Sequence, residues 1–500
     1  MHHCLEIPEL VQTIVSFVES DSALLALAQT RLFHEPALDS LWENPGSEGL
    51  HRFLACFPPG IFRFIHHSKN PARLQAVVPL RPIAPDYWTR PNEYARRIRK
   101  LKICPSSELS RTALPLLFVF LPTSSCGVLF PRLRELCCSF GDEDEASSVH
   151  LLHSLLAPTL SSLSLECHAS PERTNNVLAA VAPLLVTRDF CLTRFTISYS
   201  RRESDPSDSR SLLALVPFLA ATASLKVLDI CGPCTCTWEA IAELPQLTNL
   251  TIWELQALDL RRPSPDRTPF PSLTSLWICN AVISGTNQGL FDLFRMHRLE
   301  RLKIDAVVET TTAEMTQLVE SLSRNLSHHA LIRLDLTCDD PSPVWTLERS
   351  TILMLACFSN LQMVQMTAAD FNNKTLRAMA RCWPHLQRLE LSPAYDYAYP
   401  GLTIAALLPL AQYCPELFHL SLCLDASDQF IPQDADVTIS QHNMRTIYLQ
   451  SSPIKSPQLV AGFLVRIFPG LCQVYDENGF TTEEEEMWGQ VDKIVSENFE

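Results

Sequence analysis

The sequence predicts an α/β fold, a solenoid of stacked strand-and-helix units with a parallel sheet, preceded by a small three-helix module. Three observations predict it. A leucine motif recurs along most of the chain, a proline precedes many of its copies, and residues 1–45 instead show helical spacing of apolar residues. The 500 residues exceed the size at which a single core usually stops growing, about 250–300 residues. A core that extends along one dimension is therefore favoured.

Residues 1–45 are expected to form three short helices. Pro8 suits the first turn of a helix, and the apolar residues Leu10, Ile14, Phe17 and Val18 are spaced four, three and one apart, as on one helical stripe. Asp21 and Ser22 suit the N-terminus of a second helix. Its apolar residues are Leu24, Leu25 and Leu27, and those of the third helix are Leu32, Phe33, Leu38 and Trp42. Three such helices bury too little to be robust alone, which favours docking on a partner.

The order Leu-x-x-Pro-Glu-Leu, Ile, Phe-Val, Asp, Leu-Leu-x-Leu, Arg-Leu-Phe, Leu-Trp resembles the F-box. The resemblance implies docking on a Skp-type adaptor that sits on a cullin scaffold. The residues that it assigns to this surface or its support are Leu5, Ile7, Pro8, Glu9, Leu10, Ile14, Leu24 and Leu25. The small residue that F-boxes carry before the basic residue of the third helix is missing, since Thr30 runs directly into Arg31. The alternative is a plain helical cap on the solenoid.

Residues 46–97 are expected to be an irregular linker or an atypical first repeat, because closely spaced prolines break long helices. These prolines are Pro58, Pro59, Pro71, Pro79, Pro82, Pro85 and Pro91. The short basic run at residues 96–100 is interpreted as a solvated face rather than a nuclear-localisation signal.

The motif Leu-x-x-Leu-x-Leu/Ile repeats through residues 98–475. Strict copies begin at Leu160, Leu225, Leu247, Leu273, Leu299, Leu331, Leu386 and Leu417. Looser copies begin at Leu133, Leu192, Leu361 and Met444. Successive starts are 22 to 33 residues apart, close to the period of a strand-and-helix repeat.

A proline lies two residues before the first leucine of many copies. Because proline cannot continue a helix, it is expected to end one there, before the next strand begins. These prolines are Pro131, Pro158, Pro245, Pro271, Pro384, Pro415 and Pro469. Each unit is therefore predicted as helix, proline, strand and loop, with the motif leucines pointing inward and the residues between them outward.

This pattern resembles the leucine-rich-repeat family, which implies an irregular horseshoe with the parallel sheet on its concave face. The Asn or Cys of that family, three residues after the last leucine, is replaced, for example by Ala281, Val307 and Asp425. The usual side-chain ladder is therefore not expected. The alternative is an ordinary leucine-rich α/β domain. Residues 476–500, with Thr482 before four glutamates, are expected to form an acidic C-terminal capping helix.

Composition limits the partners and the compartment. A net charge of −15 argues against nucleic-acid binding. The N-terminus shows no apolar signal core, and no apolar stretch is long enough to span a membrane. The 18 cysteines are then expected to be reduced thiols in cytoplasm or nucleus.

The sequence predicts no enzyme, no cofactor and no metal site. Cys231, Cys234 and Cys236 form Cys-x-x-Cys-x-Cys, but no second ligand pair follows at metal-ligand spacing. Only 13 glycines are present and no phosphate-binding glycine motif occurs.

The expected function is that of a substrate-recognition subunit of a cullin-RING ubiquitin ligase, which holds an unidentified target protein on the outward face of its repeats. Candidate target contacts are Lys226, Asp229, Trp277, Arg301, Lys303, Arg333, Asp335, Arg388, Glu390 and His419. One alternative is a leucine-rich-repeat scaffold or inhibitor without a ubiquitin role. A GTPase activator is a further alternative, for which no catalytic Asn or Arg stands out.

Overall fold

The structure is a computed structural model. It describes residues 7–46, 49–67, 70–81, 83–103, 128–140, 149, 152–167, 171–187, 190–199, 214–231, 235–254, 269–281, 283, 298–307, 310–338, 345–367, 371–392, 401–432, 439–449, 452–475 and 482–499. The chain divides into two compact units, Met1–Leu247 and Thr248–Glu500.

The first unit begins with three short helices and a hairpin. The helices are α1 (Pro8–Ser16), α2 (Asp21–Leu27) and α3 (His34–Glu43). Residues 46–97 then carry α4 (Gly49–Leu54), the antiparallel strands β1 (Phe62–His67) and β2 (Asn70–Pro79), the 3-10 helix η3 (Pro85–Trp88) and α5 (Thr89–Ala95). The Pro-rich segment therefore has regular structure of its own, with Phe57 and Trp88 buried and packed edge to face at 5.0 Å.

The remainder of the first unit is a parallel sheet with helices between its strands. The strands are β3 (Lys100–Ile103), β4 (Glu135–Phe140), β5 (Ser162–Cys167), β6 (Arg194–Tyr199) and β7 (Val227–Cys231). Helix α8 (Pro171–Thr187) lies between β5 and β6 in the chain and α9 (Leu215–Ala221) between β6 and β7, whereas α10 (Thr235–Ala242) follows β7.

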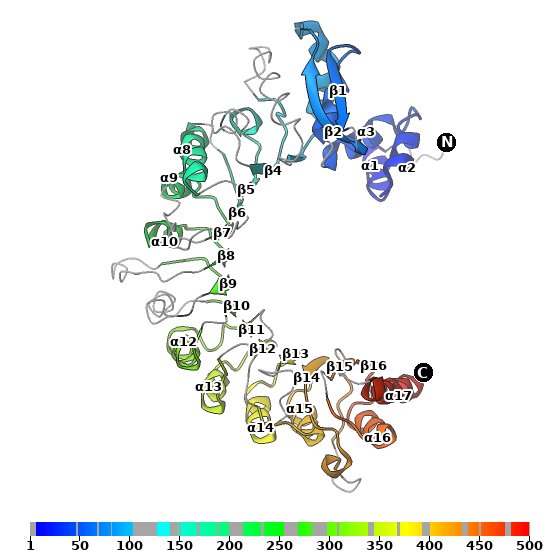
Figure 1. Ribbon diagram of the computed structural model, residues 1–500, viewed down its shortest axis with the longest axis vertical. Coiled ribbons are helices and arrows are strands. Elements are labelled where there is room, and N and C mark those ends of the chain that lie inside the picture. Colours follow the sequence, from blue (N-terminus) through cyan, green and yellow to red (C-terminus); the bar gives the residue numbers. More distant parts are fainter. Residues whose placement is uncertain are drawn as a thin grey trace. The chain divides into compact units, whose positions relative to one another are not determined.

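The second unit continues the same plan. Its parallel strands are β8 (Asn249–Trp253), β9 (Ser275–Ala281), β10 (Arg301–Ala306), β11 (Arg333–Thr337), β12 (Met363–Met366), β13 (Arg388–Leu391), β14 (His419–Leu422), β15 (Thr446–Tyr448) and β16 (Gln473–Tyr475). Its helices are α12 (Thr312–Asn325), α13 (Arg349–Met354), η5 (Leu355–Cys357), α14 (Asn373–Cys382), η6 (Ile404–Ala406), α15 (Leu407–Tyr413), η7 (Asp428–Phe430), α16 (Pro457–Ile467) and α17 (Thr482–Phe499). Helices α12 to α16 lie on one side of strands β10 to β16 (Figure 1).

The motif leucines set the register of the parallel strands of the second unit, β8 to β16, which we term the second sheet. Leu250, Leu276, Leu302 and Leu334 are direct partners on neighbouring strands, and each is buried. Successive strand residues point to opposite faces, so the residues between the motif leucines lie on the sheet face away from the helices, which we term the open face. The predicted α/β fold with a parallel leucine-rich sheet is confirmed.

Backbone hydrogen bonds join the repeats where each strand of the second sheet begins. The carbonyl oxygen of the residue before a strand accepts two N–H groups from the next repeat, as Thr248 does from Thr274 and Ser275 at 2.9 and 3.0 Å. The pattern recurs as far as Arg445, which accepts from Cys472 and Gln473.

A glutamine replaces part of the missing asparagine ladder near the end of the sheet. Gln441 is 5% exposed, and its amide group donates to the carbonyl oxygens of Pro415 and Leu417 at 3.1 and 2.7 Å. Its carbonyl oxygen accepts the N–H of Met444 at 2.8 Å. A buried side-chain amide thus satisfies three backbone groups that would otherwise lose their solvation.

The predicted proline stops coincide with helix-to-strand transitions. Pro245 lies between α10 and β8, Pro384 between α14 and β13, and Pro415 between α15 and β14. Helix α12 begins with a capping box, in which the Thr311 hydroxyl accepts the Glu314 N–H and the Glu314 carboxylate accepts the Thr311 N–H.

Helix α17 covers the last strand of the second unit. The Asp492 carboxylate accepts the Val474 N–H at 2.7 Å, and the buried Trp488 indole donates to the Ser452 carbonyl oxygen at 2.8 Å. The expected C-terminal helix therefore meets an edge strand whose polar backbone would otherwise be open to pairing.

Candidate functional site

The three N-terminal helices share a small core. Val15 of α1, Leu24 of α2 and Ala37 and Leu41 of α3 are buried against one another. Val11 of α1 is also 2% exposed. Helix α1 therefore turns its valines inward, at positions spaced four residues apart.

The larger apolar residues of α1 and of its two ends are exposed instead. The exposed fractions are 45% for Ile7, 41% for Leu10, 45% for Ile14 and 79% for Phe17. Helix α2 adds Leu25 at 56%. Five of the 14 exposed large apolar residues in the described chain thus fall within its first 25 positions. We term these five residues the N-terminal apolar face. Such a concentration of exposed apolar side chains is typical of a protein-binding surface.

The residues that the F-box resemblance assigns to adaptor contact are placed in different ways. Pro8 and Glu9 are exposed, as are Ile7, Leu10, Ile14 and Leu25. Leu24 is 5% exposed and supports the surface from the core, and Leu5 lies outside the described residues. Phe17 was assigned to a helical stripe but not to the contact set, although it is the most exposed of these side chains.

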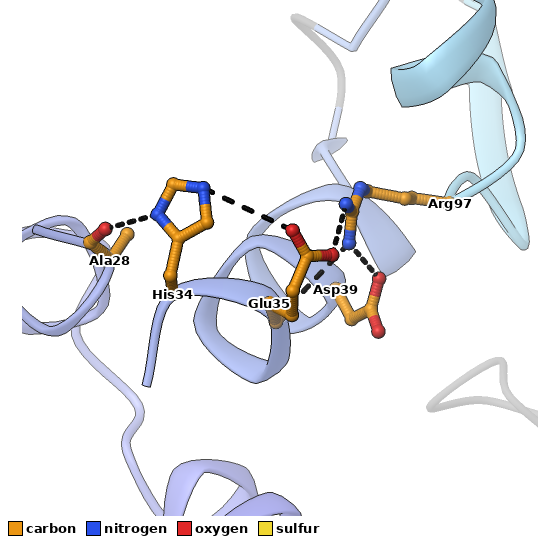
Figure 2. Close-up of polar contacts among 5 residues, drawn as sticks. All are labelled: Ala28, His34, Glu35, Asp39 and Arg97. Atoms are coloured by element: carbon orange, nitrogen blue, oxygen red, sulfur yellow. Dashed lines mark hydrogen bonds and ion pairs between the residues drawn. The ribbon is translucent and has the colours of Figure 1, made fainter. Parts of the chain in front are cut away.

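Arg97 fixes the three-helix module to the segment that leads into the first sheet. Its guanidinium donates to the carboxylates of Glu35 and Asp39 on α3 (Figure 2), the former at 2.5 Å. The Arg97 side chain is only 18% exposed, so this part of the basic run is not a solvated face. The hydrogen bond from Arg97 holds the pKa of Glu35 below its ordinary value. His34 links the same helix to α2, since its Nδ1 lies 2.6 Å from the Ala28 carbonyl oxygen (Figure 2).

The open face of strands β9 to β11 brings five of the predicted target contacts together. Arg301 is the direct partner of Arg333, and Lys303 is the direct partner of both Trp277 and Asp335. Trp277 is 41% exposed, and Arg301 is also exposed.

Carboxylates lie beneath the cations of this region. Asp335 is 2% exposed and accepts from Arg333 Nε at 2.8 Å and Nη2 at 2.7 Å. Asp305 is 4% exposed, and its Oδ2 lies 3.0 Å from Lys303 Nζ. Asp335 therefore orients Arg333 and presents little surface of its own.

A second group of predicted contacts lies on β13 and β14. Glu390 accepts from Arg388 Nε at 2.5 Å, and its Oε1 lies 3.3 Å from His419 Nε2. The hydrogen bond with His419 is the main cause that lowers the pKa of Glu390; burial opposes it, and Arg388 adds to it.

Two tyrosines that the sequence analysis did not single out extend this group. Tyr448 lies 5.2 Å from the His419 ring and stacks on Tyr475 at 4.7 Å, and Tyr475 is 38% exposed. Tyr448 is the outward residue of the loose repeat that begins at Met444, so the motif register was the signal that could have identified it.

The other two predicted contacts belong to the first unit. Asp229 lies on β7 opposite Thr196 of β6, at an outward position, and Lys226 precedes that strand and is exposed.

In the described part of the chain, no group of three or more His, Cys, Asp or Glu side chains is placed to hold a metal ion. Cys231 lies at the end of β7, whereas Cys234 and the side chain of Cys236 lie outside the described residues. The cysteines with described side chains are free thiols. Among the described helices, none is both long and apolar enough to cross a bilayer.

Among known proteins, similarity is found only to solved structures. No protein-family model matches the sequence. No curated protein matches it either. One similar solved structure is the crystal structure of the Rad7 and Elc1 complex in yeast, at 15% identity and a TM-score of 0.33, covering 78% of this chain and 79% of that chain. Another is that of the TLR13-ssRNA13 complex, at 13% identity and a TM-score of 0.34, covering 79% of this chain and 60% of that chain.

Both likenesses are weak, and the assignment of the fold depends on the chain's own strands. Those strands are parallel, follow one another in chain order, and place a motif leucine or its apolar equivalent at each inward position of the second unit. This register gives the chain the α/β fold of a leucine-rich-repeat solenoid.

Proposed function

We propose that this chain is a non-catalytic receptor subunit of a cullin-RING ubiquitin ligase in the cytoplasm or nucleus. Its three N-terminal helices bind a Skp-type adaptor, which joins them to a cullin scaffold, and the open face of its repeats binds a target protein. The receptor acts by raising the local concentration of the target near the ubiquitin-conjugating machinery.

The N-terminal apolar face is the observation that carries this proposal. Leu10 and Ile14 of the nine-residue helix α1, with Ile7 and Phe17 at its two ends, are spaced three, four and three residues apart, as on one side of a helix. Their exposure to water is unfavourable: fully burying a large apolar side chain is worth about 1.5–3 kcal/mol, and a partner would gain roughly half of that for Ile7, Leu10 and Ile14, which are 41–45% exposed. A protein partner of this helix removes that penalty, and the order of residues in the segment resembles a motif that binds such an adaptor.

Co-purification of the full chain with a Skp-type adaptor tests the proposal. The informative variant is Leu10→Asp/Ile14→Asp, because both side chains are at least 41% exposed and their replacement leaves the small core of the module intact. We expect the wild-type chain to elute with the adaptor and the variant to elute alone. The loss follows from two charges placed in an apolar contact, a change of about a hundredfold or more in affinity.

A matched control separates this loss from a general effect of acidic surface substitutions. Leu353→Asp/Leu459→Asp changes two exposed leucines on α13 and α16 in the second unit. This variant should retain the adaptor. If the folded wild-type chain does not bind the adaptor at all, the receptor proposal fails, and a leucine-rich-repeat scaffold or inhibitor without a ubiquitin role replaces it.

A further inference from the structure

The open face of β9 to β11 carries three cations beside an exposed tryptophan. We term Trp277, Arg301, Lys303 and Arg333 the Trp–Arg patch. Arg301 and Arg333 are direct partners on neighbouring strands, as are Trp277 and Lys303. Neighbouring strands lie about 4.8 Å apart, so the four side chains leave the sheet close together.

Two buried carboxylates hold part of this patch in place. Asp335 engages Arg333 through two nitrogens at 2.7 and 2.8 Å, and Asp305 engages Lys303 at 3.0 Å. Both carboxylates are at most 4% exposed. The cations that they orient lose less conformational freedom when a ligand binds, which favours binding.

Arg301 differs from its two neighbours. It is exposed, and its side chain makes no hydrogen bond or ion pair with any residue that the structure describes. It also lies directly opposite Arg333, and like charges at directly opposed positions destabilise a sheet. The patch holds three cations against the two carboxylates, a surplus of one positive charge in a chain whose net charge is −15. An anion that bridges the two arginines would relieve this repulsion.

Two exposed tryptophans add apolar surface to the open face of these strands. Trp277 on β9 is 41% exposed and Trp253 at the end of β8 is 40% exposed. Tryptophan and arginine are among the side chains that most often dominate the binding energy of protein interfaces.

We propose that the Trp–Arg patch binds an acidic segment of a partner protein. A carboxylate of that segment accepts hydrogen bonds from Arg301, with Arg333 beside it, and a neighbouring apolar side chain packs on Trp277. The inference rests on the proposed function in one respect, since it names the chemistry of the target that the open face would hold. A nucleic-acid ligand is disfavoured because Asp305 and Asp335 lie in the same patch and affinity for a phosphate backbone needs several uncompensated cations.

Selection of peptides from a displayed random library on the immobilised full chain tests this inference. The expected result is enrichment of peptides with Asp or Glu next to an aromatic or aliphatic residue. A synthetic peptide from the enriched set should bind roughly tenfold or more weakly to Arg301→Glu and to Trp277→Ala. Arg301→Glu should fold, because Arg301 has no partner to lose and a glutamate there would face Arg333.

Arg324→Glu is the matched control, since it makes the same change of charge on α12, where the Arg324 side chain is 71% exposed. It should bind the peptide as the wild-type chain does. The inference is overturned if no acidic peptides are enriched, or if Arg301→Glu and Arg324→Glu weaken binding equally. Tighter binding of a labelled single-stranded RNA than of the enriched peptide would likewise overturn it, in favour of a nucleic-acid surface.

The outcome is separable from that of the adaptor experiment. If the chain selects acidic peptides but does not bind a Skp-type adaptor, the binding role of the patch is supported and the ubiquitin role fails. If the chain binds the adaptor through α1 but peptide binding does not depend on Arg301, the receptor role is supported and the inference about the patch fails.

Discussion

Cys414 shows how burial sets the chemistry of a single side chain in this protein. Its thiol is fully buried and donates to the carbonyl oxygens of Ala380 and Trp383, both at 3.6 Å. Burial raises its pKa to about 12. Because the thiolate is the reactive species, this cysteine behaves as a small apolar residue.

Alkylation of the native chain with iodoacetamide at pH 8 checks this account. Cys191 is exposed and should be modified readily, whereas Cys414 should stay unmodified until the chain is unfolded. Mass spectrometry of the digested protein measures both. Equal modification of the two residues in the native chain would contradict the burial of Cys414.

The sequence predicted to which face of the sheet a side chain points, but it did not predict how much of that side chain is exposed. The alternation of the motif placed Trp277 and Arg301 outward, as observed. The same rule placed Asp335 outward but could not show that Arg333 covers it, because that depends on side chains. Helix α1 carries two apolar stripes, one starting at Leu10 and one at Val11, and the sequence does not show which of them meets α3.

At the scale of elements, the close approach of the backbones of neighbouring repeats explains why residue 470 is a glycine. A Cβ atom at Gly470 would lie 2.1 Å from the His442 carbonyl oxygen. This oxygen belongs to the backbone, so it cannot relieve the clash by rotating as a side chain could. Gly470→Ala should therefore destabilise the chain by about 1–3 kcal/mol. Gly462 on α16 has no atom within 4 Å of such a Cβ, so Gly462→Ala should stabilise it by up to about 1 kcal/mol.

Thermal unfolding of the two variants measures the difference. The melting temperature should fall for Gly470→Ala and rise for Gly462→Ala. A rise for both would show that the backbones of neighbouring repeats are farther apart at His442 than described.

The attachment of the three-helix module through Arg97 leads to another element-scale prediction. Arg97→Ala removes hydrogen bonds to Glu35 and Asp39, whose side chains are 67% and 55% exposed, so solvent screening limits the loss to about 1 kcal/mol. The neighbouring Arg96 is exposed, and Arg96→Ala should have little effect. Denaturant unfolding at pH 7 measures both changes.

The pH dependence of this loss follows from Glu35. Arg97 lowers the pKa of Glu35 in the folded chain, so its contribution is fully present above the unfolded carboxyl pKa, about 4.3. It disappears as the pH falls through the lowered folded value. The difference between the wild-type chain and Arg97→Ala should therefore shrink in acid, and a difference that grows in acid would contradict the assignment.

The elements themselves were predictable to different degrees. The motif and its prolines predicted the strands and the helix ends, because leucine spacing and a missing N–H act locally. The β1–β2 hairpin in the Pro-rich segment was not predicted, since its pairing depends on contacts across the turn. The role of Gln441 was not predicted because its partners, Pro415 and Leu417, lie a full repeat earlier.

At the scale of the whole molecule, the described chain offers two chemically different surfaces. The N-terminal apolar face is made of aliphatic and aromatic side chains on α1, at its two ends and on α2, whereas the Trp–Arg patch combines one indole with cations on the second sheet. An apolar face suits a constant partner and a charged one suits selective recognition. This division supports a receptor that holds an adaptor and a target with separate parts of one chain.

Hydrogen–deuterium exchange of the full chain, alone and with a Skp-type adaptor, tests this account most directly. The account predicts slower exchange of amides within Pro8–Ser16 and Asp21–Leu27 in the presence of the adaptor, with strands β8 to β16 unchanged. Unchanged exchange across both helices, or protection confined to the second sheet, would contradict it.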